Sequence, residues 1–125
     1  MIIICIPDHK AVGWNFYIHK TGHWARRGEV SNTIHQLVMA YVNSQKIKPI
    51  DYRVNITITA HSNKPLDPDN IAAKLYIDGL VLSGILKDDS RKYIGRVTLE
   101  SLKVKPKQGE FVEITIEKSE NQNPD

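Results

Sequence analysis

Cysteine is almost absent from this chain, since Cys5 is the only one in 125 residues. An internal disulfide is therefore impossible, and nothing in the cysteine count indicates an oxidising compartment. Cys5 belongs to an apolar run that predicts a strand, and we interpret it as a small core residue.

Long apolar runs are also missing. The longest, over residues 1–7, is far short of the ~20 residues that a membrane helix needs. It has neither a basic leader nor a small-residue cleavage site, so it is not typical of a signal peptide. We therefore expect a cytoplasmic protein with no membrane contact.

Positive charge exceeds negative charge by only three in the whole chain. The last segment, "SENQNPD" (119–125), holds two acids and no base, so residues 1–118 carry +5. This balance favours a polyanionic partner. The length allows one domain with a real core and not two. We predict a single domain over residues 1–118 and a disordered tail over 119–125.

The first half of the chain contains one clear helical pattern. Apolar residues recur at helical spacing from about Arg26 to near Gln45, and this stripe consists of Ile34, Leu37, Val38, Tyr41 and Val42. Before it, "IIICI" (2–6) predicts a buried strand. Residues 7–25 have no clear period and predict a long loop, with a short extended piece at "WNFYIH".

The second half predicts three strands and one helix. "DYRVNITITAH" (51–61) alternates strictly, with an apolar face for the core and a polar face for solvent or a ligand. A helix is predicted from about Asn70 to Leu82, capped by Asp69 and ended by Gly84. "YIGRVTLESLKV" and "GEFVEITIEK" flank the turn "KPKQG" and predict a hairpin, with a bulge between Leu99 and Leu102.

This order predicts an α/β (mixed α+β) fold. We expect a small four-stranded sheet, mainly antiparallel or mixed, with two helices in the order β-α-β-α-β-β.

Acidic side chains gather in one part of this basic chain. Five of the fourteen lie between residues 67 and 89: Asp67, Asp69, Asp78, Asp88 and Asp89. Asp67 and Asp69 are two residues apart, and Pro68 favours extended backbone at Asp67, so both carboxylates point the same way. Two adjacent carboxylates repel, and a bound divalent cation removes that cost. The pattern therefore indicates a Mg²⁺ site, to which the pair Asp88 and Asp89 contributes if the chain doubles back.

Other interpretations of these acids stay open. Asp69 could be only a helix cap, and Asp88 and Asp89 could be solvated loop charge. A calcium-binding EF-hand loop is excluded, because Ile71 and Ala72 stand where that loop requires a ligand and a glycine.

The segment "DPDNIAAKLYIDGLVLSGILKDDS" resembles the signature of RusA-like Holliday junction resolvases. In that family a D-x-D-N motif opens a helix with a lysine, and a G-x-x-x-D-D-[SA] segment follows. The resemblance covers residues 65–91, and it is looser over "GWNFYIHKTGHWARRGEVSNTI" (13–34). It implies a RusA-like fold and a Mg²⁺-dependent endonuclease, with Mn²⁺ as a substitute. The implied protein acts as a homodimer on four-way junction DNA in recombination and repair, in a bacterial or phage-infected cell. No small-molecule cofactor is implied.

The resemblance also assigns roles to residues. Asp67, Asp69 and Asp89 would be the catalytic metal ligands, with Asp88 as a further ligand or supporting residue. Asn70 matches the asparagine of the motif.

One position departs from the family pattern. The family lysine lies four residues after the second aspartate, where this chain has Ala73. Lys74 comes one residue later, about 100° further around the helix. We expect Lys74 to take the catalytic role, with Lys87 or Lys92 as alternatives. Alternatively, Lys74 could form only an i, i+4 ion pair with Asp78.

Basic and aromatic side chains could contact DNA. The candidates for phosphate contacts are Arg26, Arg27, Arg91, Lys92, Lys103, Lys105 and Lys107. The last three would lie on one side of a regular strand, or could simply be solvated charge that protects an edge. His19, His23 and His61 could lie near the site, and Trp14 and Trp24 could stack on unpaired bases or be buried under the loop.

Three functions remain as hypotheses. The first is the active junction resolvase, which makes paired symmetric nicks. The second is a catalytically inactive protein of the same fold that only binds branched DNA. The third is an unrelated fold in which the acids are caps and loop charge.

Overall fold

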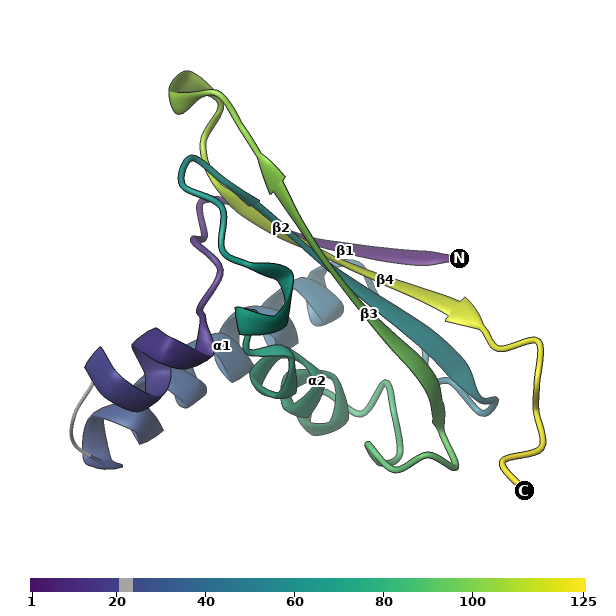
Figure 1. Cartoon of the computed structure of the whole chain (residues 1–125). Helices are drawn as coiled ribbons and strands as arrows, with labels where there is room; N and C mark the ends of the chain where they lie inside the picture. Colours follow the sequence, from purple (N-terminus) through teal and green to yellow (C-terminus); the bar gives the residue numbers. More distant parts are fainter. Residues whose placement is uncertain (21–23) are drawn as a thin grey trace.

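The computed structural model describes residues 1–20 and 24–125, and it leaves the side chains of residues 19, 20, 24 and 25 undescribed. The main elements follow the predicted order of strands and helices (Figure 1). Along the chain they are β1 (Ile2–Ile6), the π-helix η1 (Phe16–Lys20), α1 (Trp24–Ser44), β2 (Val54–Ser62), the 3-10 helix η2 (Pro68–Asn70), α2 (Ala73–Leu82), β3 (Ile94–Lys103), the 3-10 helix η3 (Pro106–Gln108) and β4 (Phe111–Lys118). The extended piece predicted at "WNFYIH" is wrong, because η1 occupies most of it.

The four strands form one mixed sheet in the order β1-β4-β2-β3. β4 pairs antiparallel with both β1 and β2, and β3 pairs parallel with β2. The predicted hairpin of β3 and β4 is therefore wrong, since β2 lies between them. β2 takes the central position because its core face, from Val54 to Ala60, is fully buried. The connection over residues 104–110 is long enough to cross it, because two strand spacings are only about 10 Å.

The irregularity of β3 lies at its start. Val54 pairs with Ile94 and Asn55 with Arg96, so Gly95 is the extra residue. The bulge predicted between Leu99 and Leu102 is wrong. β3 is an edge strand exposed over most of its length, so its apolar residues do not mark a single buried face.

The helices α1 and α2 cover one face of the sheet (Figure 1). The stripe predicted for α1 faces the core, with Ile34, Val38 and Val42 buried. The two helices cross closely at Gly79, where a Cβ atom would lie only 2.8 Å from Cβ of Val38. A side chain at this position would push the helices apart. No described helix is long and apolar enough to cross a membrane.

The helix α2 begins later than its sequence predicted. Ile71 is extended and fully buried, and its bridge to Gly13 interrupts the helical pattern. The N-cap is Ala72, so the prediction that Asp69 caps this helix is wrong. The predicted exit is confirmed, because Gly84 follows the C-cap with φ of 85°.

Residues 119–125, for which we predicted disorder, lie against the start of β2. Ser119 is buried, and its N–H donates to the carbonyl of Arg53 at 2.8 Å. Hydrogen bonds thus connect this polar segment to the residue before β2.

Candidate functional site

Lys74 and Asp89 form an ion pair between α2 and the loop that follows it. Lys74 lies in the first turn of α2, and its Nζ donates to Asp89 Oδ2 at 2.7 Å across the turn that follows the helix. It also donates to Asp78 Oδ1 at 3.1 Å, which is the i, i+4 pair that the sequence suggested. One ammonium group therefore joins α2 to the loop that carries Asp88 and Asp89.

The two partners stabilise each other's charged form. The hydrogen bonds from Lys74 to Asp89 and then Asp78 raise the pKa of the lysine. The hydrogen bond and the positive charge of Lys74 lower the pKa of the Asp89 carboxyl, and Asp88 lowers it further. Both groups are thus ionised at neutral pH.

Asp88 forms a hydrogen bond with the main chain of the next residue in the loop. Its Oδ1 accepts the N–H of Asp89 at 2.7 Å. Both Asp88 and Asp89 are exposed. The supporting role expected for Asp88 stays a prediction.

Asp67 and Asp69 lie on the approach to α2. As predicted, the residue before Pro68 is extended, with φ of −63° and ψ of 140°. Both aspartates are exposed, and neither carboxylate has a hydrogen-bond or ion-pair partner within the described part of the chain. Free carboxylate oxygens of this kind are the donors that Mg²⁺ prefers.

Asn70 connects this acidic turn to the N-terminal segment. Its Oδ1 accepts the backbone N–H of Asn15 at 3.0 Å. Its amide also lies so close to Gly13 that a Cβ atom there would be 2.6 Å from Nδ2. Asn70 therefore positions η2, and Gly13 is required for this close approach.

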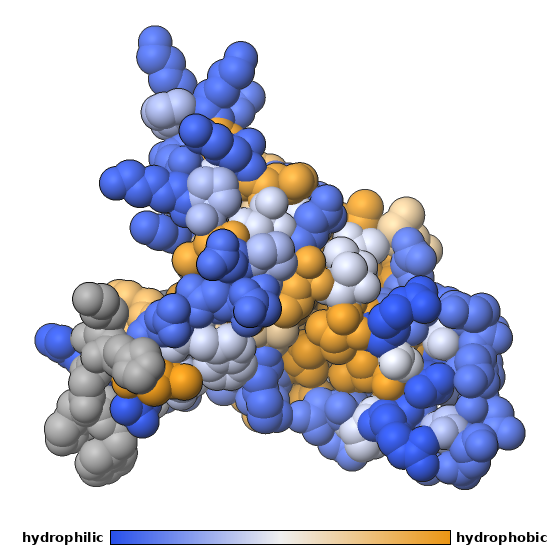
Figure 2. Space-filling model, viewed as in Figure 1, coloured by the Kyte–Doolittle hydropathy of each residue, from blue (hydrophilic) through white to orange (hydrophobic). Residues whose placement is uncertain are grey.

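A cavity of about 420 Å³ opens beside Lys74 and Asp89. Its lining combines apolar side chains with three charged ones, those of Lys74, Asp89 and Arg91. The full lining is Ala73, Lys74, Ile77, Asp89, Arg91, Ile94, Gly95 and Val97. Figure 2 shows an apolar patch between hydrophilic regions where α2 meets β3. Asp67 and Asp69 do not line the cavity.

The acids are of the type that Mg²⁺ prefers, but the described residues do not gather them into one site. Among residues 1–20 and 24–125, no three histidine, cysteine, aspartate or glutamate side chains come close enough to hold a metal ion together. Asp67 and Asp69, at the N-cap and inside the 3-10 helix η2, have free oxygens, and Asp89 has an oxygen that Lys74 already contacts. An ion shared by all three would require Lys74 and the loop to adjust.

The predicted phosphate contacts lie in three different regions. Arg26 and Arg27 are at the start of α1, and Arg27 Nη2 donates to the carbonyl of Ile18 at 2.9 Å. Arg91 and Lys92 follow Asp89, and Lys92 Nζ lies 5.5 Å from the centre of the Tyr93 ring.

The lysines near the crossing connection form the third region. Lys103 ends β3, whereas Lys105 and Lys107 belong to the turn around η3, so the three do not alternate along one strand as predicted. All three are exposed. The tip of the molecule that carries them is hydrophilic (Figure 2).

Of the histidines and tryptophans that the sequence suggested, the structure describes the side chains of His61 and Trp14. His61 bonds Glu113 at 2.6 Å and stacks on Phe111 with ring centres 4.0 Å apart. Trp14 is half-buried against the core. His23 lies outside the described residues, and the side chains of His19 and Trp24 are undescribed.

No protein-family model matches this chain, and no curated protein matches it.

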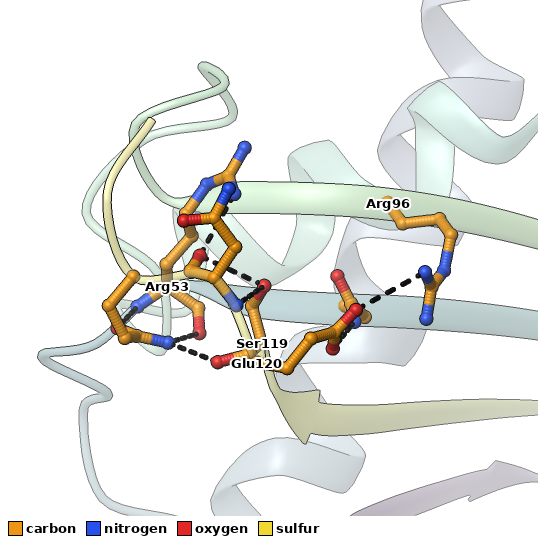
Figure 3. Close-up of polar contacts among 7 residues, drawn as sticks. Arg53, Arg96, Ser119 and Glu120 are labelled. Atoms are coloured by element: carbon orange, nitrogen blue, oxygen red, sulfur yellow. Dashed lines mark hydrogen bonds and ion pairs between the residues drawn. The ribbon is translucent and has the colours of Figure 1, made fainter. Parts of the chain in front are cut away.

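Two arginines near the site were missed by the sequence analysis. Arg53 directly precedes β2, and Arg96 belongs to β3. Both arginines contact the segment 119–125 (Figure 3). The alternating pattern over residues 51–61 placed Arg53 on the polar face, which we expected to meet solvent or a ligand. The pattern did not indicate that the segment 119–125 would contact Arg53.

Proposed function

We propose that the chain is a Mg²⁺-dependent structure-specific endodeoxyribonuclease with a RusA-like fold. It would resolve four-way DNA junctions by paired symmetric nicks. The observation that carries the proposal is the contact of Lys74 with Asp89, fifteen residues apart in sequence. It joins the helix that directly follows "DPDN" to the loop that holds "KDD", so the lysine and the third acid of the resembled motif lie at one place.

Each residue of this group has a role suited to phosphodiester cleavage. Asp67, Asp69 and Asp89 would hold Mg²⁺, with Asp88 as a supporting residue. The bound ion would activate water and neutralise the charge that builds on the phosphate. Lys74 would stabilise the same developing charge from the side of α2. Asn70 would keep η2, and with it Asp67 and Asp69, in a fixed position.

Charge separates the two tasks of such an enzyme. Carboxylates at the site hold the cation, while the basic residues around it hold the DNA backbone. A homodimer would place one site on each of two opposed strands, because a four-way junction is approximately two-fold symmetric.

A junction-cleavage assay with and without Mg²⁺ tests the proposal. The wild-type protein should make symmetric nicks, and Asp69→Asn should bind the junction without cutting it. Asp51→Asn is the matched control, because Asp51 is also exposed and has no partner among the described residues. Normal cutting by Asp69→Asn would overturn the assignment.

The alternative is a catalytically inactive branched-DNA-binding protein. One observation favours it: the ammonium of Lys74 already contacts the Asp89 oxygen that a metal would need. Tight junction binding with no cleavage in Mg²⁺ or Mn²⁺ would select this function.

A further inference from the structure

The segment 119–125 is fixed at its inner end by hydrogen bonds to the main chain of Arg53. The side chain of Gln122 accepts the N–H of Arg53 at 2.9 Å and donates to its carbonyl at 2.9 Å. The same amide donates to the carbonyl of Ser119 at 2.6 Å. The Arg53 guanidinium in turn donates to the carbonyl of Asn121 at 3.0 Å (Figure 3). These contacts set the direction in which the rest of the segment runs.

The outer part of the segment brings two carboxylates onto two arginines. Glu120 Oε1 lies 3.5 Å from Arg96 Nη1, and Asp125 Oδ1 lies 3.1 Å from Arg91 Nη2. The carbonyl of Pro124 also accepts from Arg91. All four charged side chains are more than 60% exposed. Ion pairs this exposed contribute little stability, because water and salt screen them.

The two arginines border the candidate site. Arg91 lines the cavity that contains Lys74 and Asp89. Arg96 lines a second, polar cavity of about 310 Å³ together with Arg53 and Glu120. Gly95 belongs to the lining of both cavities, so they are neighbours. A DNA strand whose phosphate lay beside Lys74 would therefore pass next to Arg91 and Arg96.

We propose that Arg91 and Arg96 bind DNA phosphates next to the scissile one, and that the segment 119–125 occupies them in the free protein. This inference rests on the proposed function for the identity of the anion. A guanidinium binds carboxylate and phosphate oxygens with the same forked geometry. DNA releases counterions when it binds, so its phosphates displace two weakly held carboxylates. The anchored residues Ser119 and Gln122 keep the displaced carboxylates close by.

The test compares two double variants that remove the same charge. Glu120→Gln with Asp125→Asn removes both carboxylates from the arginines but keeps the anchor. Glu100→Gln with Glu117→Gln is the control, since both residues are exposed and neither has a partner among the described residues. Affinity for a four-way junction and for a duplex of equal length is measured by fluorescence anisotropy without divalent cations, so no cleavage occurs.

We expect the first double variant to bind both DNAs about two- to tenfold more tightly than wild type, as two freed phosphate contacts would allow. The control should change affinity less than twofold. Arg96→Gln should weaken wild-type binding and should remove most of the gain from Glu120→Gln when the two are combined. Equal affinities of the two double variants, or no DNA binding by either, would overturn the inference.

Failure of the nuclease proposal gives a different result. If the first double variant binds DNA more tightly but no variant cuts, the phosphate contacts are supported and the nuclease proposal is overturned. If the protein cuts junctions but both double variants have the same affinity, the nuclease proposal is supported and competition by the segment 119–125 is overturned.

Discussion

The Arg53 guanidinium donates from Nε to the main-chain carbonyl of Arg91 at 2.9 Å, and from Nη1 to that of Asn121 at 3.0 Å. One side chain thus links the start of β2 to the loop after α2 and to the chain end. That loop also contains Asp88 and Asp89, so Arg53 helps to fix the candidate site although it does not line its cavity.

Replacing Arg53 should loosen both segments. We expect Arg53→Gln to lower the free energy of unfolding by about 1 kcal/mol, because the hydrogen bonds to two carbonyls are lost and both can still reach water. Amide hydrogen exchange should become faster at residues 90–93 and 119–122. Lys48→Gln is the matched control, since Lys48 is exposed and has no partner among the described residues. Equal exchange in the two variants would contradict this role.

Gly95 lies closely against three polar side chains. A Cβ atom there would lie 2.8 Å from Asn55 Oδ1, 3.1 Å from Ser119 Oγ and 3.2 Å from Arg53 Nη1. We expect Gly95→Ala to cost about 1 kcal/mol of stability, the low end for overpacking, because the neighbours that must shift are the ends of side chains. Gly28→Ala in α1 is the control: its Cβ meets nothing within 4 Å, so it should stabilise the protein by about 0.5–1 kcal/mol. Chemical denaturation measures both effects, and a neutral Gly95→Ala would contradict the close approach.

Local patterns predicted the elements better than their pairing. The helical stripe of α1 and the alternation of β2 depend on side chains close in sequence, and both emerged as predicted. The choice of β2 as the partner of both β3 and β4 depends on how much apolar surface each strand can bury in the whole molecule. A plausible turn at "KPKQG" could not reveal that competition.

The candidate site shows the same division. The extended backbone at Asp67 follows from Pro68 and was predictable, but the start of α2 was not. Burial of Ile71, through a bridge to Gly13 far away in sequence, outweighed the capping preference of Asp69. The contact of Lys74 with Asp89 likewise depends on the turn after α2. The sequence was compatible with such a turn but did not predict it. The polar segment 119–125 makes hydrogen bonds with the main chain of Arg53 that its composition does not encode.

The Tyr76 hydroxyl should stabilise the fold through two hydrogen bonds. It accepts the N–H of Val12 at 3.1 Å and bonds His9 Nε2 at 2.8 Å, and burial raises the pKa of Tyr76 to about 12. Tyr76→Phe should cost about 1–2 kcal/mol, since a buried N–H loses its acceptor. Tyr41→Phe is the control, because the Tyr41 hydroxyl has no hydrogen-bond partner among the described residues. Thermal denaturation of both variants checks the difference.

His9 itself should destabilise the fold in mild acid. Burial lowers the pKa of His9 below its ordinary value of 6.5, so the unfolded chain binds the proton more readily than the folded one. Stability from this group is therefore present above pH 6.5 and is lost as the pH falls below it. His9→Gln should flatten that part of the stability curve, measured by urea denaturation between pH 5 and pH 8. An unchanged curve would show that His9 does not cause the loss.

The acid limb of stability should depend on Lys74. Because Lys74 lowers the pKa of Asp89 from its ordinary value of 3.8, the ionised pair stabilises the fold above that pH and the contribution is lost as the pH falls further. In Lys74→Gln the pKa of Asp89 should move up, which carbon-detected NMR titration of the carboxyl group measures. Lys87→Gln, a control on the same loop with no partner in the described chain, should leave it unchanged.

The same variant should separate metal binding from catalysis. In the proposed enzyme the Lys74 ammonium repels a cation and contacts the Asp89 oxygen that the cation needs. Lys74→Gln should therefore bind Mg²⁺ more tightly by calorimetry, since the competing charge is gone. It should also cut junctions at least about 100-fold more slowly, because nothing replaces the positive charge beside the phosphate. Lys87→Gln should bind and cut as wild type does. Unchanged Mg²⁺ binding by Lys74→Gln would mean that Asp89 is not a metal ligand, because removal of the Lys74 contact would then have no effect on the ion.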